Sequence, residues 1–130
     1  MWEENKMLIE CRSFGFKNGI DNGANLLFDL RCLPNPFYIE ELKEKTGLDK
    51  PVRDYILNLE QSQNYLNKIL DMITFLIPMY EEKGNESFKI SFGCTGGHHR
   101  SVTFALTVCE ILKQKGFNTV AVHRDIDIKD

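Results

Sequence analysis

One stretch in the second half of the chain constrains the fold most, because it predicts a strand, a glycine-containing loop and a helix in direct succession. Residues 89–93 are rich in strand-forming side chains. Gly96 and Gly97 follow, and glycine can adopt backbone angles that are closed to other residues. Residues 101–115 are mostly good helix formers and end at a glycine. A strand that leads through a tight loop into a helix is typical of an α/β protein.

The loop between this strand and this helix has the composition of an anion site. The first amides of a helix have no partner within the helix, and the helix dipole places partial positive charge beside them. Arg100 adds a planar guanidinium with a full charge. We therefore predict that residues 94–101 form an anion-binding loop, and phosphate is the anion that such loops commonly hold.

Strand-like and helix-like segments alternate through the remaining chain. Strands are expected at residues 7–14, 26–31, 89–93 and 118–125, and helices at residues 39–45, from Asp49 onwards, and at residues 61–82. In the long helix the apolar side chains recur at helical spacing and predict one buried face; they are Tyr65, Leu66, Ile69, Leu70, Ile73, Leu76, Ile77 and Tyr80. The alternation predicts one α/β domain, residues 1–130, with a mostly parallel four- to five-stranded sheet flanked by helices.

The strand predicted at residues 26–31 is almost continuously apolar, which indicates burial on both faces. Asp29 and Arg31 are its polar members, and their spacing directs both side chains to one side of the strand. Two interpretations remain open: a structural ion pair, or a pair at the strand's carboxyl end, where open α/β sheets bind ligands. Asn35 follows in a loop whose two prolines exclude helix and central strand.

Bulk composition limits the classes of partner. The net charge of −3 gives no general attraction to nucleic acid, and no apolar run approaches the length of a membrane span. No signal-peptide pattern is present at the N-terminus. The four cysteines form no CxxC motif, so free thiols in the reducing cytoplasm are expected. These features favour a cytoplasmic protein without a membrane partner and without a cofactor.

Five segments together resemble the C-terminal domain of the RapZ (YvcJ) family. The most specific are Gly-Cys-Thr-Gly-Gly-x-His-Arg-Ser and Asp-x-Arg-x-Leu-Pro-Asn-Pro. The resemblance runs in order from about residue 7 to the end of the chain, through the segments Ser13–Lys17, Phe28–Pro36, Thr46–Val52, Gly93–Val102 and His123–Ile126.

The resemblance implies a regulatory or adapter domain that binds a phosphorylated amino sugar such as glucosamine-6-phosphate. It also implies RNA as a partner, and either a homo-oligomer or a separate P-loop protein. The pocket that it implies would contain Thr95, Gly96, Gly97, His99, Arg100 and Ser101, with Asp29, Arg31 and Asn35 nearby. No GxxxxGK[ST] motif occurs, so nucleotide hydrolysis is not expected of this chain. The C-terminal tail alternates acidic and apolar residues, whereas the family's RNA binding relies on a lysine-rich tail.

Two alternative interpretations of the loop are based on its nucleophile and its histidines. Cys94 and Arg100 satisfy Cys-x5-Arg, the loop of cysteine-dependent phosphatases, with Asp29 or Asp125 as the general acid. The four side chains Cys94, His98, His99 and His123 could instead ligate a metal, but their spacing does not match a zinc site, and we do not predict one. A structural role also remains open for Arg100, as an ion pair with Asp29 or Asp125.

Overall fold

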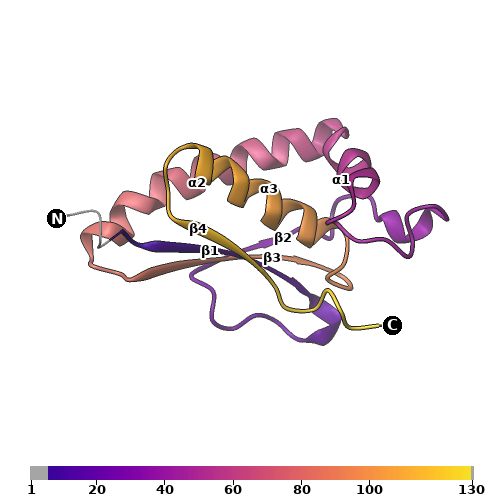
Figure 1. The fold of residues 1–130 in the computed structure, drawn as a ribbon, viewed down its shortest axis with the longest axis horizontal. Helices are drawn as coiled ribbons and strands as arrows, with labels where there is room; N and C mark the ends of the chain where they lie inside the picture. Colours follow the sequence, from indigo (N-terminus) through magenta and orange to yellow (C-terminus); the bar gives the residue numbers. More distant parts are fainter. Residues whose placement is uncertain (1–5, 130) are drawn as a thin grey trace.

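The computed structural model describes residues 6–129 as a parallel sheet whose helices all lie on one face (Figure 1). The strands are β1 (Leu8–Gly15), β2 (Leu26–Asp29), β3 (Ser87–Cys94) and β4 (Thr119–His123), in the order β2-β3-β1-β4. The helices are α1 (Lys50–Leu57), α2 (Glu60–Glu82) and α3 (Arg100–Gln114), with short 3-10 turns η2 (Phe16–Asn18) and η3 (Pro36–Tyr38). The predicted α/β class is confirmed, with four parallel strands.

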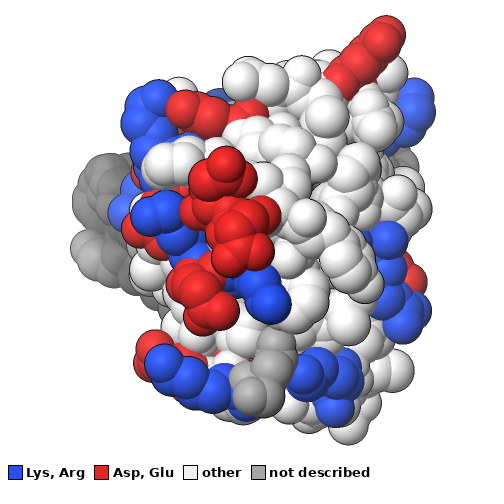
Figure 2. Space-filling view, turned by 90° about the vertical axis from the view of Figure 1, so that its right-hand side faces the viewer, with Lys and Arg blue, Asp and Glu red and all other residues white. Residues whose placement is uncertain are grey.

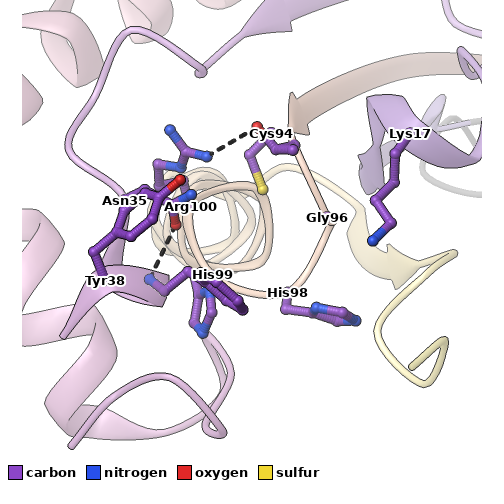
Figure 3. Close-up of a pocket in the computed structure, with 10 residues that line it drawn as sticks. Lys17, Asn35, Tyr38, Cys94, Gly96, His98, His99 and Arg100 are labelled. Carbon is purple, nitrogen blue, oxygen red and sulfur yellow. Dashed lines mark hydrogen bonds between the residues drawn. The ribbon is translucent and has the colours of Figure 1, made fainter. Parts of the chain in front are cut away.

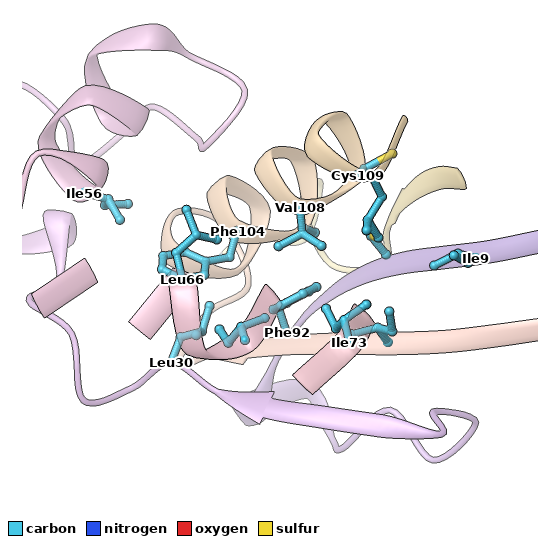
Figure 4. Packing of buried hydrophobic residues seen from close by; sticks show 14 of the residues in the cluster. Ile9, Leu30, Ile56, Leu66, Ile73, Phe92, Phe104, Val108 and Cys109 are labelled. Carbon is cyan, nitrogen blue, oxygen red and sulfur yellow. The ribbon is translucent and has the colours of Figure 1, made fainter. Parts of the chain in front are cut away.

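The core lies between the helices and one face of the two central strands. In the register of β1 and β3, Ile9 is opposite Phe88 and Cys11 is opposite Ile90, and all four side chains are buried. Because strand side chains alternate between faces, these residues and Phe92 form one apolar surface. Figure 4 shows Phe92 beside α3, whose Phe104 and Val108 point down toward the sheet.

The apolar stripe predicted in the long helix is confirmed. Leu66, Ile69, Ile73 and Ile77 are buried, and the other four predicted members pack against the same cluster. The opposite side of α2 exposes Phe75 to solvent. The helix is therefore amphipathic and adds its buried side to the core beside α3.

Within residues 6–129 no α-helix covers the second face of the sheet, which is crossed by the connection from β1 to β2 (Figure 1). The two central strands carry a polar cluster on this face: Arg12 donates to both oxygens of Asp21, at 2.7 and 3.1 Å, and Ser91 donates to Asp21 at 2.6 Å. Arg12 also pairs with Glu10 at 3.0 Å. The charged cluster fastens the connecting loop to the two central strands.

Two local predictions are wrong for tertiary reasons. The strand predicted at residues 26–31 ends at Asp29 and forms an edge of the sheet, so its side chains are half-buried or exposed and not buried on both faces. Residues 39–45 form successive turns, because the carbonyl of Ile39 accepts from both Leu42 and Lys43 and no regular helix continues. Near the C-terminus, the Ile128 carbonyl accepts a hydrogen bond from His98 Nε2 at 2.6 Å.

The remaining bulk expectations concern the cysteines and the membrane. All four cysteines are free thiols, and Cys32 alone among them is exposed. None of the helices formed by residues 6–129 has the length and apolar character needed to cross a membrane.

We expect Phe92→Ala to lower the free energy of unfolding by about 3–5 kcal/mol, because the ring is fully buried and its removal leaves a cavity. Phe92 also stacks on Phe28, with 5.8 Å between the ring centroids. Urea denaturation followed by circular dichroism measures the change. The matched control is Phe75→Ala on the exposed side of α2, which should change stability by less than about 0.5 kcal/mol. Equal effects of the two substitutions would contradict this packing.

We expect Asp21→Asn to destabilise the fold at neutral pH and to matter less in acid. Burial opposes ionisation of Asp21, but hydrogen bonds from Arg12 and Ser91 outweigh it and lower the pKa of the carboxyl below its ordinary value. A lowered pKa in the folded state gives stability that is present above about pH 4 and is lost as the pH falls through the folded pKa. The stability difference between the wild type and Asp21→Asn should therefore shrink below about pH 4. A difference that does not change with pH would show that the charge is not the cause.

Candidate functional site

A cavity of about 190 Å³ opens where β3 ends and α3 begins. It lies at the carboxyl end of the parallel sheet, which is where open α/β folds bind ligands. Figure 3 looks along α3 toward its first turn, with the loop from Cys94 to His99 around it. The lining residues come from three segments of the chain: Lys17, Asn35, Phe37, Tyr38, Cys94, Thr95, Gly96, His98, His99 and Arg100.

The loop is held against the end of β1 by a close approach of two backbones. Gly97 has a φ of +82°, and a Cβ atom on it would lie 2.6 Å from the amide nitrogen of Gly15. A Cβ on Gly15 would lie 2.4 Å from the Gly96 carbonyl carbon. The Gly15 amide donates to Asp125 Oδ2 at 2.7 Å, which fixes this end of β1. Side chains larger than hydrogen cannot occupy these positions without moving the loop.

The amides and the carbonyls of the loop are used differently. The Thr95, His98 and His99 carbonyls accept hydrogen bonds from the amides of Lys17, Gly47 and Thr103. In contrast, the amides of residues 95–100 donate no hydrogen bond to any other group in residues 6–129. The loop therefore presents several N–H groups that have no acceptor in the described chain, at the positive end of a 15-residue helix.

Arg100 is 3% exposed, and its charge has no carboxylate partner among the described residues. Its Nη1 donates to the Leu33 carbonyl at 2.8 Å and to the Arg31 carbonyl at 3.2 Å. Nη2 makes a long hydrogen bond of 3.4 Å to Thr95 Oγ1, and Nε is buried without a partner within the described chain. An unpaired buried cation is costly unless other groups satisfy it, so this guanidinium favours an anion nearby.

The carboxylates proposed as structural partners of Arg100 are both occupied elsewhere. Asp29 pairs with Arg31 at 2.8 Å, and Asp125 pairs with Arg124 at 2.8 Å. Hydrogen bonds from Arg31 lower the pKa of Asp29. For Asp125, burial acts in the opposite direction, but the hydrogen bonds from Arg124 and the Gly15 amide prevail and lower its pKa. Both groups are therefore ionised at neutral pH, and neither lines the cavity.

His99 is a buried imidazole on the cavity wall. Its side chain is 6% exposed, and Nε2 has no hydrogen-bond partner in the described structure. Burial, followed by the charge of His98, lowers its pKa, although backbone carbonyls of the 42–45 turn act in the opposite direction. The ring is therefore neutral at pH 7 and can donate one hydrogen bond.

Cys94 lies at the start of the loop, and in Figure 3 its sulfur points toward the first turn of α3. The thiol donates to Ser101 Oγ at 3.2 Å, and the Ser101 amide donates to Sγ at 3.4 Å. Cys94 is only 2% exposed, although it is one of the residues that line the cavity.

The structure brings together five of the nine residues predicted for the pocket, and they line the cavity: Asn35, Thr95, Gly96, His99 and Arg100. Gly97 instead packs on β1, and Ser101 lies behind the cysteine sulfur. Asp29 and Arg31 form the ion pair that one of our two interpretations describes, and the Arg31 guanidinium lies 3.8 Å from the Phe16 ring centroid.

Sequence reasoning missed three lining residues, Lys17, Phe37 and Tyr38, and it placed His98 in the anion loop without assigning it to the pocket. Lys17 and Phe37 belong to the segments that support the family resemblance or adjoin them, and that was the only signal available. Tyr38 is 82% exposed at the rim, and Phe37 packs edge-on against it with 5.6 Å between the centroids. The side chain of His123 lies outside the cavity, where Nδ1 is 2.6 Å from Ser13 Oγ.

A second cleft of about 500 Å³ adjoins the cavity and shares Phe37 and His98 with it. Its charged lining contains both signs: Lys43, Glu44, Lys45, Asp127 and Lys129. Figure 2 shows the same end of the molecule, with basic and acidic side chains intermingled in one band and a broad uncharged area beside it. This face therefore offers no continuous basic surface.

Comparisons with known proteins agree on one family. Residues 7–127 match the family model described as the RapZ C-terminal domain. Curated bacterial relatives named "Nucleotide-binding protein" include those of Alkaliphilus oremlandii, 52% identical over 97% of this chain, and Caldicellulosiruptor saccharolyticus, 50% identical over 93%. A relative from Clostridioides difficile is 52% identical over 95% of the chain. The matches cover 43%, 41% and 44% of these proteins, so the chain spans less than half of their length.

The family match extends from the first described strand to beyond the last one and includes the whole cavity lining. At about 50% identity over nearly the full chain, the relationship is continuous rather than confined to the loop motif. This chain belongs to the RapZ C-terminal domain family.

Proposed function

We propose that the cavity binds the phosphate group of a phosphorylated small molecule, and that the chain acts as a ligand-binding regulatory domain of its family. The observation that carries the proposal is that two kinds of donor meet at the start of α3. The loop amides have no acceptor in the described chain, and the buried Arg100 forms no ion pair with a carboxylate there. Amides and a guanidinium are the donors that proteins use for phosphate. The neutral His99 adds a further donor in the same wall.

We propose a sugar phosphate, with glucosamine-6-phosphate as the first candidate, as the natural ligand. The aromatic rings of Phe37 and Tyr38 stand at the cavity and can cover the apolar face of a sugar ring. The phosphate would reach the loop amides while the ring stays near η3. Because no carboxylate is found among the lining residues, the amino group would contribute less to binding than the phosphate.

We expect Arg100→Ala to weaken glucosamine-6-phosphate binding at least about tenfold, because hydrogen bonds to charged groups contribute about 1.5–3 kcal/mol. Isothermal titration calorimetry measures the affinity, and thermal melting reports the separate cost of leaving the Arg31 and Leu33 carbonyls without a donor. The matched control is Lys50→Ala, which removes an exposed cation from α1 outside the cavity.

Wild-type affinity in a folded Arg100→Ala protein would refute the assigned site. If Arg100→Ala does not fold, Arg100→Lys replaces it, because lysine can still donate to one of the two carbonyls but loses the planar fork. Lys50→Ala should bind like the wild type.

We expect the phosphate, and not the amine, to govern affinity. Glucosamine should give no measurable thermal shift, whereas glucose-6-phosphate should stabilise the fold within about tenfold of the glucosamine-6-phosphate affinity. The reason is the lining itself, which offers cations and amides but no carboxylate to pair with an ammonium. Strict dependence on the amino group would contradict this account and would indicate a carboxylate brought in by a rearrangement.

A further inference from the structure

The anion loop has a pattern more specific than phosphate binding requires, namely Cys-x-x-Gly-x-x-Arg-Ser formed by Cys94, Gly97, Arg100 and Ser101. Each member has a distinct position in the structure. Gly97 has the positive φ that turns the loop, Arg100 begins α3, and Ser101 contacts the cysteine sulfur with both its amide and its hydroxyl. A loop that only binds phosphate does not need a sulfur held at its start by the first turn of the helix.

We propose that Cys94 is a phosphoryl acceptor, so that the site can be phosphorylated on sulfur by a phosphate ester bound in the cavity. The inference rests on the proposed phosphate binding and adds a covalent step to it. The Cys94 thiolate attacks phosphorus, an S–P bond forms, and the P–O bond to the leaving group breaks. The leaving group departs with the electron pair as an oxyanion, and the thiol proton passes to solvent.

The first support is the position of the sulfur. Cys94 lines the same cavity as the loop residues whose amides have no acceptor in the described chain, so a phosphate held by those amides would share the cavity with the cysteine. The thiolate is the nucleophilic form of cysteine. Ser101 can stabilise it, because its amide already donates to Sγ and its hydroxyl, now an acceptor, can rotate to donate.

The second support is independent of the cysteine and concerns buried polar atoms without partners. Arg100 Nε and His99 Nε2 have no hydrogen-bond partner within the described chain, and both side chains are more than nine-tenths buried in the wall of this cavity. Such groups are rare in folded proteins because each costs desolvation energy. An equatorial phosphoryl oxygen carries the charge that these donors would satisfy as the step proceeds.

The lining also restricts which esters can react. No carboxylate is found among the described residues that line the cavity, and the two aspartates considered as general acids, Asp29 and Asp125, are ion-paired elsewhere. A leaving oxygen therefore has no carboxylic acid beside it, and the site favours esters whose leaving group is stable as an anion. Aryl phosphates meet that condition, whereas sugar phosphates do not, so a sugar phosphate would bind without reacting.

The second half-reaction needs a base that activates water to hydrolyse the S–P bond. No carboxylate is found among the described lining residues. His98 Nε2 is held by the Ile128 carbonyl, and His99 would act as a donor to the phosphoryl oxygen rather than as a base. The phosphorylated cysteine should therefore accumulate instead of turning over. With p-nitrophenyl phosphate we expect a burst of one equivalent of nitrophenolate per chain, followed by a much slower release. Intact-mass spectrometry should show one added phosphoryl group, and peptide mapping should place it on Cys94.

The test compares four proteins: the wild type, Cys94→Ser, Ser101→Ala and the matched control Cys32→Ser, which removes the exposed thiol outside the cavity. Cys94→Ser should abolish the burst and the mass change but keep glucosamine-6-phosphate affinity within about threefold. Ser101→Ala should slow the burst without changing its one-equivalent size, which identifies Ser101 as a positioning residue. Cys32→Ser should behave like the wild type.

Two results would overturn the inference in different ways. If glucosamine-6-phosphate binds but wild-type protein gives neither a burst nor an adduct, covalent chemistry is refuted and the proposed binding function stands. If neither ligand binds the wild type, both proposals fail together. An adduct mapped to Cys32, or a burst that survives in Cys94→Ser, would also refute Cys94 as the acceptor.

Discussion

The anchoring of Arg100 is the interaction on which the candidate site depends most. Its Nη1 joins the carbonyls of Arg31 and Leu33, which follow β2, to the first residue of α3. Carbonyl dipoles hold the guanidinium in place, and no carboxylate among the described residues forms a direct ion pair with it. The pairs Asp29–Arg31 and Asp125–Arg124 keep the nearest acids occupied. The fold thus keeps a buried positive charge available beside the cavity.

The loop beside this charge is shaped by backbone contact more than by side chains. Gly15 at the end of β1 and Gly97 in the loop approach so closely that neither position has space for a Cβ. With its carbonyls committed to Lys17, Gly47 and Thr103, the loop has little freedom to turn its amides away from the cavity. Preorganised donors lose less entropy on binding than mobile ones, so this rigidity favours a small anion.

Much of this could be predicted from the sequence because it is local. A strand, two glycines and a helix lie within residues 89–115, and their order alone places amides and Arg100 at one point. Tyr38 and Lys17 could not be found in this way, since tertiary packing brings them to the cavity from distant segments. The burial of residues 26–31 was mispredicted for a related reason. An edge strand beside a long helix has the same apolar composition as a central strand, and only the strand order distinguishes them.

The one-sided arrangement of the helices links the stability of the sheet to the site. Because no helix covers the second face, the loop after β1 crosses it, and the Arg12–Asp21–Ser91 cluster fastens that loop. The same connection begins with η2, whose Lys17 amide donates to the Thr95 carbonyl and whose side chain reaches the cavity. The connection between β1 and β2 therefore contacts the anion loop at its start and is held by the charged cluster at Asp21. Charges remote from the cavity hold the segment that supports its entrance, which is a reason for a small domain to keep ion pairs where apolar packing would also serve.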